Sequence, residues 1–311
     1  MNKPKIPAWL ALSLLVPVLW GVWGAFIDIP RKHTPSFPDT LSYIVWSLTM
    51  VPCALIALGL KKWKLKTSPK AIFYGLLVGI TGAGGQLVLF KTLAIGPAYI
   101  VFPVISLSPV VTVIMSFFIL RERAGKMSAL GIILSLVAIL LLSIQEPDTD
   151  HITGYWWLVG SLAIFAAWGL QAFFIKSSAG DIDDESMYAY MTISGLLLAP
   201  VAIMMTDFGK PINYGWSGPG LAALIQSLNS IGALLLVYAI RKGKSIIVVP
   251  MINGLAPLIT IVLSLIVSHV FPIVVNVVGM FAAIVAVVLI AFDEASGSAS
   301  KPPPARVALD G

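Results

Sequence analysis

The sequence predicts an all-α integral membrane protein with ten transmembrane helices, arranged as two inverted five-helix repeats. The first observation is composition: of 311 residues, 58% are hydrophobic and 11% are charged, with a mean hydropathy of +0.95. A water-soluble domain of this size would aggregate with so apolar a composition. The second observation is that long apolar runs recur along almost the whole chain, and the third is an internal repeat between its two halves.

Ten of the apolar runs reach the length of about 20 residues that a helix needs to cross a hydrocarbon core of about 30 Å. The connections between them are short, so we expect function among the helices rather than in a soluble domain. The first run follows two lysines but lacks a cleavage site of small residues, which favours a retained helix over a signal peptide. The predicted spans are residues 8–27, 40–60, 71–91, 97–120, 127–145, 155–175, 187–205, 219–240, 245–267 and 272–292.

The distribution of lysine and arginine predicts the orientation, because these residues accumulate in cytoplasmic loops. Sixteen of the 20 lysines and arginines lie at one set of helix ends, together with both termini, and four lie at the other set. We therefore expect a multi-pass protein of the cell inner membrane, in contact with the lipid bilayer, with both termini in the cytoplasm. This topology accounts for the net charge of +6 without a nucleic-acid partner.

An internal repeat relates the two halves of the chain at a spacing of about 148 residues. The segment "WGVWGAF" (20–26) aligns with "WGLQAFF" (168–174). The segment "GPAYIVFPVISLSPVVTVIMS" (96–116) aligns with "GKSIIVVPMINGLAPLITIVLS" (243–264) once one residue is inserted. Paired prolines in register are hard to obtain by chance between two apolar segments, so we interpret the match as a repeat.

Each repeat holds five predicted helices, an odd number, so the second repeat enters the membrane from the opposite side to the first. Inverted repeats of this kind give many secondary transporters their two access states. The predicted division of the chain is 1–148 for the first repeat, 149–294 for the second, and 295–311 for a disordered cytoplasmic tail rich in Ser, Pro, Gly and Ala.

Four features of the sequence resemble the drug/metabolite transporter superfamily, in its ten-helix EamA-type branch. They are the five-plus-five layout, the "WGVWGAF" start of the first helix, the block "KTLAIGPAYIVFPVISLSPVVTVIMSFFILRER", and the "GxxxSxxA" pattern that begins at Gly131. The resemblance implies a central cavity lined by helices one, three, four, six, eight and nine, with alternating access by rocking of the two halves. It also implies a small-molecule substrate, such as an amino acid, a nucleotide derivative or a sugar. Glu122 matches the family's acidic residue after the fourth helix, whereas the second repeat offers only His269.

Paired prolines in the fourth and ninth predicted helices are interpreted as helix breaks. A proline inside a helix donates no backbone hydrogen bond and leaves the carbonyl four residues earlier without its usual partner. In a membrane such a carbonyl is tolerated where protein or a watery cavity satisfies it. A kink satisfied by a neighbouring Ser or Thr is the alternative for any one proline, but symmetric pairs favour a cavity wall. The predicted breaks are at Pro103, Pro109, Pro250 and Pro257.

Aromatic and polar residues within the spans are the candidates for substrate binding, because ligand pockets combine aromatic walls with a few polar groups. Ordinary packing and interhelical hydrogen bonds are the alternative for each residue taken alone. Helices two, five, seven and ten are almost bare of amides, and we expect them to face lipid or to pack outside the cavity. The candidate binding residues are Trp20, Trp23, Gln86, Lys91, Tyr99, Ser106, Trp168, Gln171, Asn229, Tyr238 and Asn253.

Charged residues close to the spans are few, and all lie near predicted helix ends, where anchoring at the interface is the favoured role. Lys91 would favour an anionic substrate group if it pointed inward. Asp28 and Glu122 are the candidates for coupling transport to a proton or another ion. The pattern indicates no cofactor and no metal, and it leaves the oligomeric state open.

Two other classes of protein stay open beside a transporter. An intramembrane enzyme would need a motif such as HExxH or GxSxG, which the sequence does not contain, and its three histidines lie outside the spans. A membrane channel would need a ring of like residues or an oligomer, which a single sequence does not test.

Overall fold

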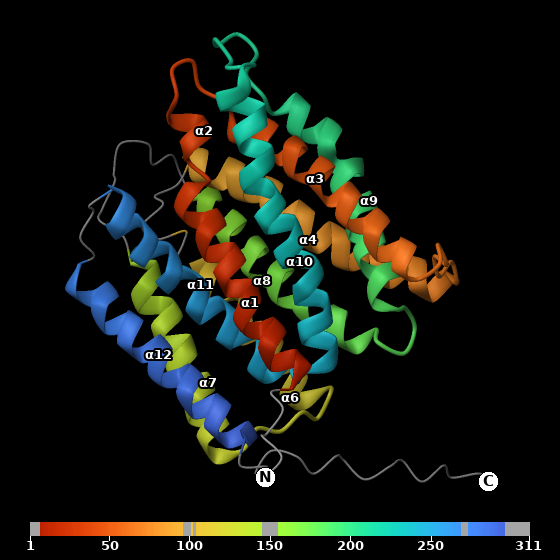
Figure 1. Ribbon diagram of the computed structural model, residues 1–311, viewed down its shortest axis with the longest axis vertical. Coiled ribbons are helices and arrows are strands. Elements are labelled where there is room, and N and C mark those ends of the chain that lie inside the picture. The colour runs from red at the N-terminus through yellow and green to blue at the C-terminus, as the bar shows by residue number, and fades with distance from the viewer. Residues whose placement is uncertain (1–6, 96–100, 102–103, 145–154, 269–272, 296–311) are drawn as a thin grey trace.

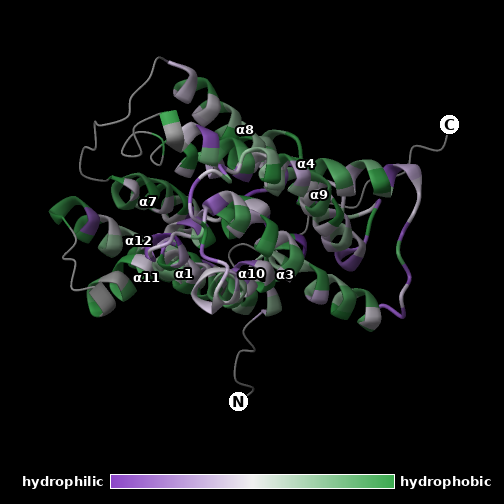
Figure 2. Ribbon diagram, turned by 90° about the horizontal axis from the view of Figure 1, so that it is seen from above, coloured by the Kyte–Doolittle hydropathy of each residue, from purple (hydrophilic) through white to green (hydrophobic). Residues whose placement is uncertain are grey.

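The computed structural model describes residues 7–95, 101, 104–144, 155–268 and 273–295. Among the described residues, nine helices are long and apolar enough to cross a membrane. Apolar residues follow these helices along most of their length (Figure 2). A π-helical turn, η1 (Trp216–Gly220), precedes α10. The α-helices in chain order are α1 (Ala8–Phe26), α2 (Ile29–Lys32), α3 (Asp39–Leu60), α4 (Pro69–Ile95), α6 (Ser108–Phe118), α7 (Lys126–Ser143), α8 (Trp156–Ser177), α9 (Asp184–Met204), α10 (Leu221–Lys242), α11 (Ser245–Ser268) and α12 (Val274–Ala295).

The predicted fold class is confirmed, since every predicted span coincides with a described helix. The ends shift by a few residues, and the fourth span is described only in part, as the apolar helical stretch Val104–Phe118. Helices are the expected solution because each backbone polar group in a membrane must find its partner within the same segment. The tail residues 296–311 lie outside the described residues.

Two threonine hydrogen bonds show the repeat in the packing of the helices. The Thr112 hydroxyl on α6 donates to the carbonyl of Gly169 on α8 at 2.8 Å, and the Thr260 hydroxyl on α11 donates to the carbonyl of Gly21 on α1 at 3.0 Å. Donor and acceptor both shift by 148 residues between the two bonds. Glycine is needed at both acceptors, because a Cβ there would lie 2.4–2.5 Å from a side chain of the partner helix.

A second symmetric pair of bonds joins the first helix of each repeat to the other repeat. Trp20 Nε1 on α1 donates to the carbonyl of Asn229 on α10 at 3.4 Å, and Trp168 Nε1 on α8 donates to the carbonyl of Gly82 on α4 at 3.3 Å. The packing follows the same exchange: α1 packs against α10 and α11, while α8 packs against α4 and α6. Figure 1 shows α7 beside α12 on one side of the molecule and α3 beside α9 on the other.

The two repeats run in opposite directions. Trp9, in the first turn of α1, lies against Gly243, and Lys176, in the last turn of α8, donates a hydrogen bond to the carbonyl oxygen of Gly243. Helix α1 therefore begins at the end of the bundle where its counterpart α8 finishes. An odd number of spans in each repeat accounts for this inversion.

The described loops gather at two ends of the bundle, as the predicted topology requires. At one end, here called the basic end, the segments after α3, α6, α8 and α10 meet, with ion pairs Lys61–Glu185 at 3.7 Å and Lys70–Asp181 at 3.9 Å. At the other, here called the opposite end, the segment between α1 and α3 meets the segment after α9. There the hydroxyls of Thr40 and Thr206 are 2.7 Å apart.

The prediction that the ninth helix is broken is wrong. Helix α11 runs without interruption through both Pro250 and Pro257. Each proline removes one hydrogen bond, and the remaining bonds of the turn keep the helix intact; α1, α3 and α9 also contain internal prolines without interruption.

The fourth helix, in contrast, is interrupted. Leu107 forms a turn, and α6 begins again at Ser108 with Pro109 in its first turn, where a backbone N–H would have no partner within the helix in any case. The interruption thus lies two residues before Pro109, which occupies the first turn of the restarted helix. The predicted break at Pro103 lies outside the described residues.

Candidate functional site

A cavity of about 280 Å³ lies between the two repeats, bordered mainly by α1, α3, α4, α8, α10 and α11. We call it the central cavity. Its lining residues, all within the described part of the chain, include no Asp, Glu, Lys, Arg or His. The polar and aromatic side chains of the lining are those of Trp20, Trp23, Trp46 and Trp168, of Gln86, Gln171, Asn229 and Asn253, and of Ser108.

Three of the four indoles are fixed by their ring nitrogens. Besides the symmetric bonds of Trp20 and Trp168, Trp23 Nε1 donates to Oε1 of Gln226 at 2.9 Å. Gly85 and Gly232 make room for these rings, since an added Cβ would lie 2.5 Å from Trp168 Nε1 or 2.4 Å from Trp20 Nε1. These three indoles thus form rigid apolar walls whose N–H groups are already used.

The amide side chains of the central cavity have hydrogen-bonding capacity to spare. Among the described residues, the side chains of Gln86, Gln171 and Asn229 make no hydrogen bond, and Asn253 uses only its Nδ2, which donates to the carbonyl of Val249 at 2.9 Å. Burying an amide without a partner costs about 1–3 kcal/mol, so amides are kept at such positions where water or a ligand satisfies them. Both donors and acceptors are therefore on offer to a bound solute.

A narrower space of about 20 Å³, here called the neck, adjoins the central cavity on the side of the opposite end. It shares Trp23 and Trp46 with the cavity and adds Tyr43, Phe90 and Asp39. The Asp39 side chain is 40% exposed, so the neck leads from the cavity to the surface at the opposite end.

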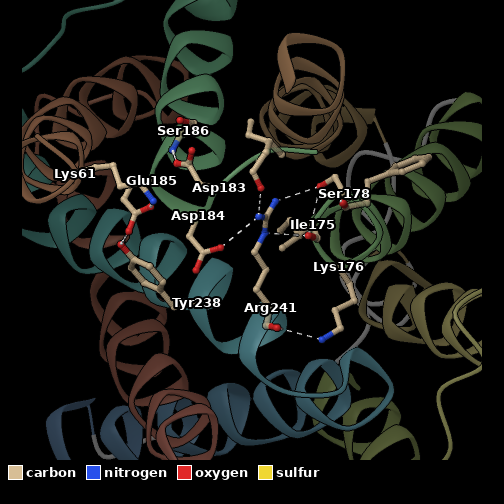
Figure 3. Close-up of polar contacts among 12 residues, drawn as sticks. Lys61, Ile175, Lys176, Ser178, Asp183, Asp184, Glu185, Ser186, Tyr238 and Arg241 are labelled. Atoms are coloured by element: carbon tan, nitrogen blue, oxygen red, sulfur yellow. Dashed lines mark hydrogen bonds and ion pairs between the residues drawn. The ribbon is translucent and has the colours of Figure 1, made fainter. Parts of the chain in front are cut away.

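At the basic end the central cavity is closed. Ile175 and Ile240 form part of its lining and are completely buried. Immediately beyond them lies Arg241, whose side chain is only 4% exposed. Its guanidinium donates to the carbonyls of Ile175 at 3.1 Å and of Ile182, to the Ser178 hydroxyl at 3.2 Å, and to Oδ1 of Asp184 at 3.2 Å (Figure 3).

Lys176 and Glu122 extend this arrangement towards α11. Lys176 Nζ donates to the carbonyl of Arg241 at 3.2 Å and lies 3.9 Å from Oε1 of Glu122 (Figure 3 shows the first contact). Oε2 of Glu122 accepts hydrogen bonds from the Ser245 hydroxyl at 2.9 Å and from the Ile246 amide at 3.0 Å. A carboxylate here suits the positive end of the α11 dipole. We call Glu122, Lys176, Asp184 and Arg241 the basic-end network.

The structure brings seven of the eleven candidate binding residues together around the central cavity. Ser106 is half-buried but does not line it, whereas Ser108, two residues later, does. Tyr99 lies outside the described residues. The seven residues at the cavity are Trp20, Trp23, Gln86, Trp168, Gln171, Asn229 and Asn253.

Four other candidates lie away from the central cavity. Lys91 is exposed and lines neither space. The Tyr238 hydroxyl donates to Oε1 of Glu185 at 3.1 Å, near the basic end (Figure 3). Asp28 is half-exposed and pairs with Arg31 at 3.0 Å, and Glu122 caps α11. These residues lie near helix ends, where long polar side chains reach the membrane interface instead of the cavity.

The expectation that helices two and seven stay outside the cavity is also wrong. Trp46 and Met50 of α3 line the central cavity, as does Met191 of α9. Trp46 Nε1 is buried and makes no hydrogen bond within the described residues. Its place in the second turn of an apolar span, away from the interface that tryptophan prefers, is the signal that could have identified it.

Two inverted repeats around an interior cavity define a membrane transporter of the drug/metabolite type, as the resemblance implied. The sequence profile of the EamA-like transporter family matches residues 7–144 and again residues 153–292. The chain therefore belongs to the EamA-like transporter family. It is a multi-pass membrane protein in which the family's repeat occurs twice.

The chain is also similar to individual proteins. The chain is 33% identical over 137 residues to the uncharacterized protein MJ1333.1 of Methanocaldococcus jannaschii, a match that covers 44% of this chain and 97% of that protein. It is 26% identical over 185 residues to protein LicB of Haemophilus influenzae, covering 53% of this chain and 61% of LicB. A protein crystal structure matches with a TM-score of 0.69 at 15% identity, covering 90% of this chain and 95% of that one, which shows the fold alone.

Proposed function

We propose that the protein is a secondary transporter that carries a small organic solute across the membrane by alternating access. The observation that carries the proposal is the central cavity. There, three amide side chains that make no hydrogen bond within the described residues face a space walled by indoles, three of which are held by their ring nitrogens. Its volume of about 280 Å³ is near the lower limit of small-molecule sites, roughly 300–1,000 Å³, so the solute is small.

The closed basic end and the neck at the opposite end support alternating access. A carrier needs one state open to each side, and inverted repeats supply both states from one plan. We take the basic end as cytoplasmic from its lysines and arginines. The structure then corresponds to the state that faces away from the cytoplasm.

In this proposal the basic-end network is the closed gate. Its members come from the ends of α6, α8, α9 and α10, and they fasten these ends to the start of α11. Opening the cavity to the cytoplasm requires these elements to separate, so the network has to break in each transport cycle. Glu122 is thereby better placed for ion coupling than Asp28, because protonating it would weaken the contact with Lys176.

The proposal is tested with the purified full-length protein. A thermal-shift screen against amino acids, sugars, nucleotides and amines identifies solutes that bind the folded state, because such binding raises its apparent stability. Uptake of a hit into proteoliposomes is then measured with and without a pH gradient. Glu122→Gln shows whether a gradient effect depends on the network.

We expect saturable uptake that Gln171→Ala and Trp168→Ala abolish. Leu162→Ala on the same helix is the matched control, since Leu162 is 51% exposed on the outside of the bundle and should leave uptake unchanged. Uptake that survives both cavity substitutions would contradict the proposal. Conductance far above carrier turnover would favour a channel instead.

A further inference from the structure

The side chains that line the central cavity indicate which charge of solute it can accept. The described residues that line the central cavity include four indole rings and no ionisable side chain, so a solute with a net charge finds no counter-ion among them. The face of an indole ring carries partial negative charge, which attracts cations and repels anions. Amide oxygens can also point towards a cation. The lining therefore accepts a positive group more readily than a negative one.

The neck adds a carboxylate on the way to this cavity. Asp39 lines the neck together with Trp23, Trp46, Tyr43 and Phe90. The rings of Tyr43 and Trp46 are held 5.3 Å apart, centroid to centroid, and the Tyr43 hydroxyl donates to a backbone carbonyl of α9 at 3.3 Å. Aromatic faces beside a carboxylate are the usual surroundings of a bound ammonium group.

Asp39 is not fully neutralised by its partner. Arg31 Nη2 lies 3.0 Å from Asp28, whereas Arg31 Nε lies 3.7 Å from Asp39. One guanidinium is thus shared by two carboxylates, and the three groups together carry a charge of −1. Lys32 and Lys91 are exposed at helix ends and line neither the neck nor the cavity.

We propose that the transported solute is an organic cation, met in the neck by Asp39 and held in the central cavity by indole faces and amides. This inference rests on the proposed transport function of the same cavity and adds the charge of its substrate. The amides would bind hydrogen-bonding groups elsewhere on the cation.

Three probes of similar size and different charge test the proposal by isothermal titration calorimetry on the full-length protein: benzyltrimethylammonium, benzyl alcohol and phenylacetate. We expect benzyltrimethylammonium to bind with a dissociation constant at least about tenfold below that of benzyl alcohol, which is about 1.4 kcal/mol. Phenylacetate should show no binding.

Variants locate the effect. Asp39→Asn should weaken binding of benzyltrimethylammonium roughly three- to tenfold and leave benzyl alcohol unchanged, because it removes a charge and keeps the side-chain shape. Asp207→Asn is the matched control: Asp207 lies at the same end, 63% exposed and paired with Lys210 at 3.6 Å, and lines neither space. It should change nothing.

The outcomes separate this inference from the transport proposal. If benzyl alcohol or phenylacetate binds as tightly as the cation, and Gln171→Ala removes that binding, the cavity is a solute site but the inferred charge is wrong. If Asp39→Asn leaves the cation affinity unchanged, the role of Asp39 is overturned. If no probe shows binding that depends on Gln171, both the inferred charge and the proposed site are overturned.

Discussion

Replacing Arg241 by methionine should open the central cavity at the basic end. The guanidinium of Arg241 makes three hydrogen bonds to groups of α8 and the following turn and pairs with Asp184. Methionine resembles the aliphatic stem of arginine in length and apolar character, but it lacks the guanidinium and so loses all of these contacts. If the basic-end network is the gate, most of these contacts exist only in the closed state.

The magnitude follows from burial. Removing one partner of a buried ion pair costs about 3–5 kcal/mol. The Asp184 side chain is 22% exposed and so is partly screened, which places the expected loss at the lower end, about 3 kcal/mol. That figure corresponds to roughly 150-fold in the ratio of closed to open molecules. Contacts that persist in the open state reduce the shift, and we expect at least a tenfold change.

Cysteine labelling measures the change. The chain has one cysteine, Cys53, so a Cys53→Ser background can carry a single reporter at Leu236, which lines the cavity on α10. A membrane-impermeant maleimide applied to the basic end should label Leu236→Cys at least about tenfold faster in Arg241→Met. Lys61→Met is the control, because the Lys61 side chain is 45% exposed and its contact with Glu185 is 3.7 Å long, so that this pair is worth only about 0–1 kcal/mol. Unchanged labelling in a folded Arg241→Met protein would refute the gate.

Three further predictions concern packing and stability. Gly82→Val should abolish solute uptake, because an added Cβ would lie 2.1 Å from a side-chain amide of α8, while Gly84→Val, whose Cβ meets nothing closer than 3.9 Å, should retain uptake. Thr112→Val and Thr260→Val should each lower the free energy of unfolding by about 0.5–1.5 kcal/mol in reversible detergent unfolding, and equal stability of both variants with the parent would contradict the repeat-related bonds. Burial raises the pKa of the Asp183 carboxyl, but the hydrogen bond from the amide N–H three residues later and the other favourable contacts of the carboxylate outweigh it and hold the pKa below its ordinary value. Asp183→Ala should therefore cost about 1 kcal/mol at neutral pH, with a difference in melting temperature that narrows as the pH falls below about 4.

The sequence predicted the helices because lipid imposes them on the chain, and it predicted the repeat because paired residues stay in register between the two halves. Each span must be apolar over its whole length, and this constraint is visible residue by residue. Trp20 and Trp168, which align in the repeat, are also equivalent in the structure, since each donates its indole N–H to a backbone carbonyl of the other repeat. Most of the proposed cavity residues could also be predicted, because amides are scarce within membrane spans and an interior cavity is one of the few environments that accommodates them.

Tertiary placement was beyond the sequence in other cases. A proline removes one hydrogen bond, and the surrounding packing decides what the helix does there. Helix α11 continues through its two prolines, whereas the fourth helix is interrupted and restarts at Ser108, beside Pro109. Trp46 has no amide neighbours in its span, and only the meeting of α3 with α10 brings it to the cavity. In the sequence, Arg241 looks like one of several basic residues at a helix end. Only the structure shows that its side chain is buried against α8.

The repeats share one fold, yet their charges make the two access states unequal. In the repeat alignment, Lys176 falls on Asp28 and Arg241 falls on Ala94, so the first repeat has no counterpart of the carbonyl-binding cations. The described ion pairs at the opposite end, Asp28–Arg31, Arg31–Asp39 and Asp207–Lys210, are about half-exposed or more and worth roughly 0–1 kcal/mol each. A state closed at that end would lose the buried basic-end network and gain little in exchange. We therefore expect the empty protein to rest with its basic end closed, and the binding of solute, or of a proton at Glu122, to supply the free energy that opens it.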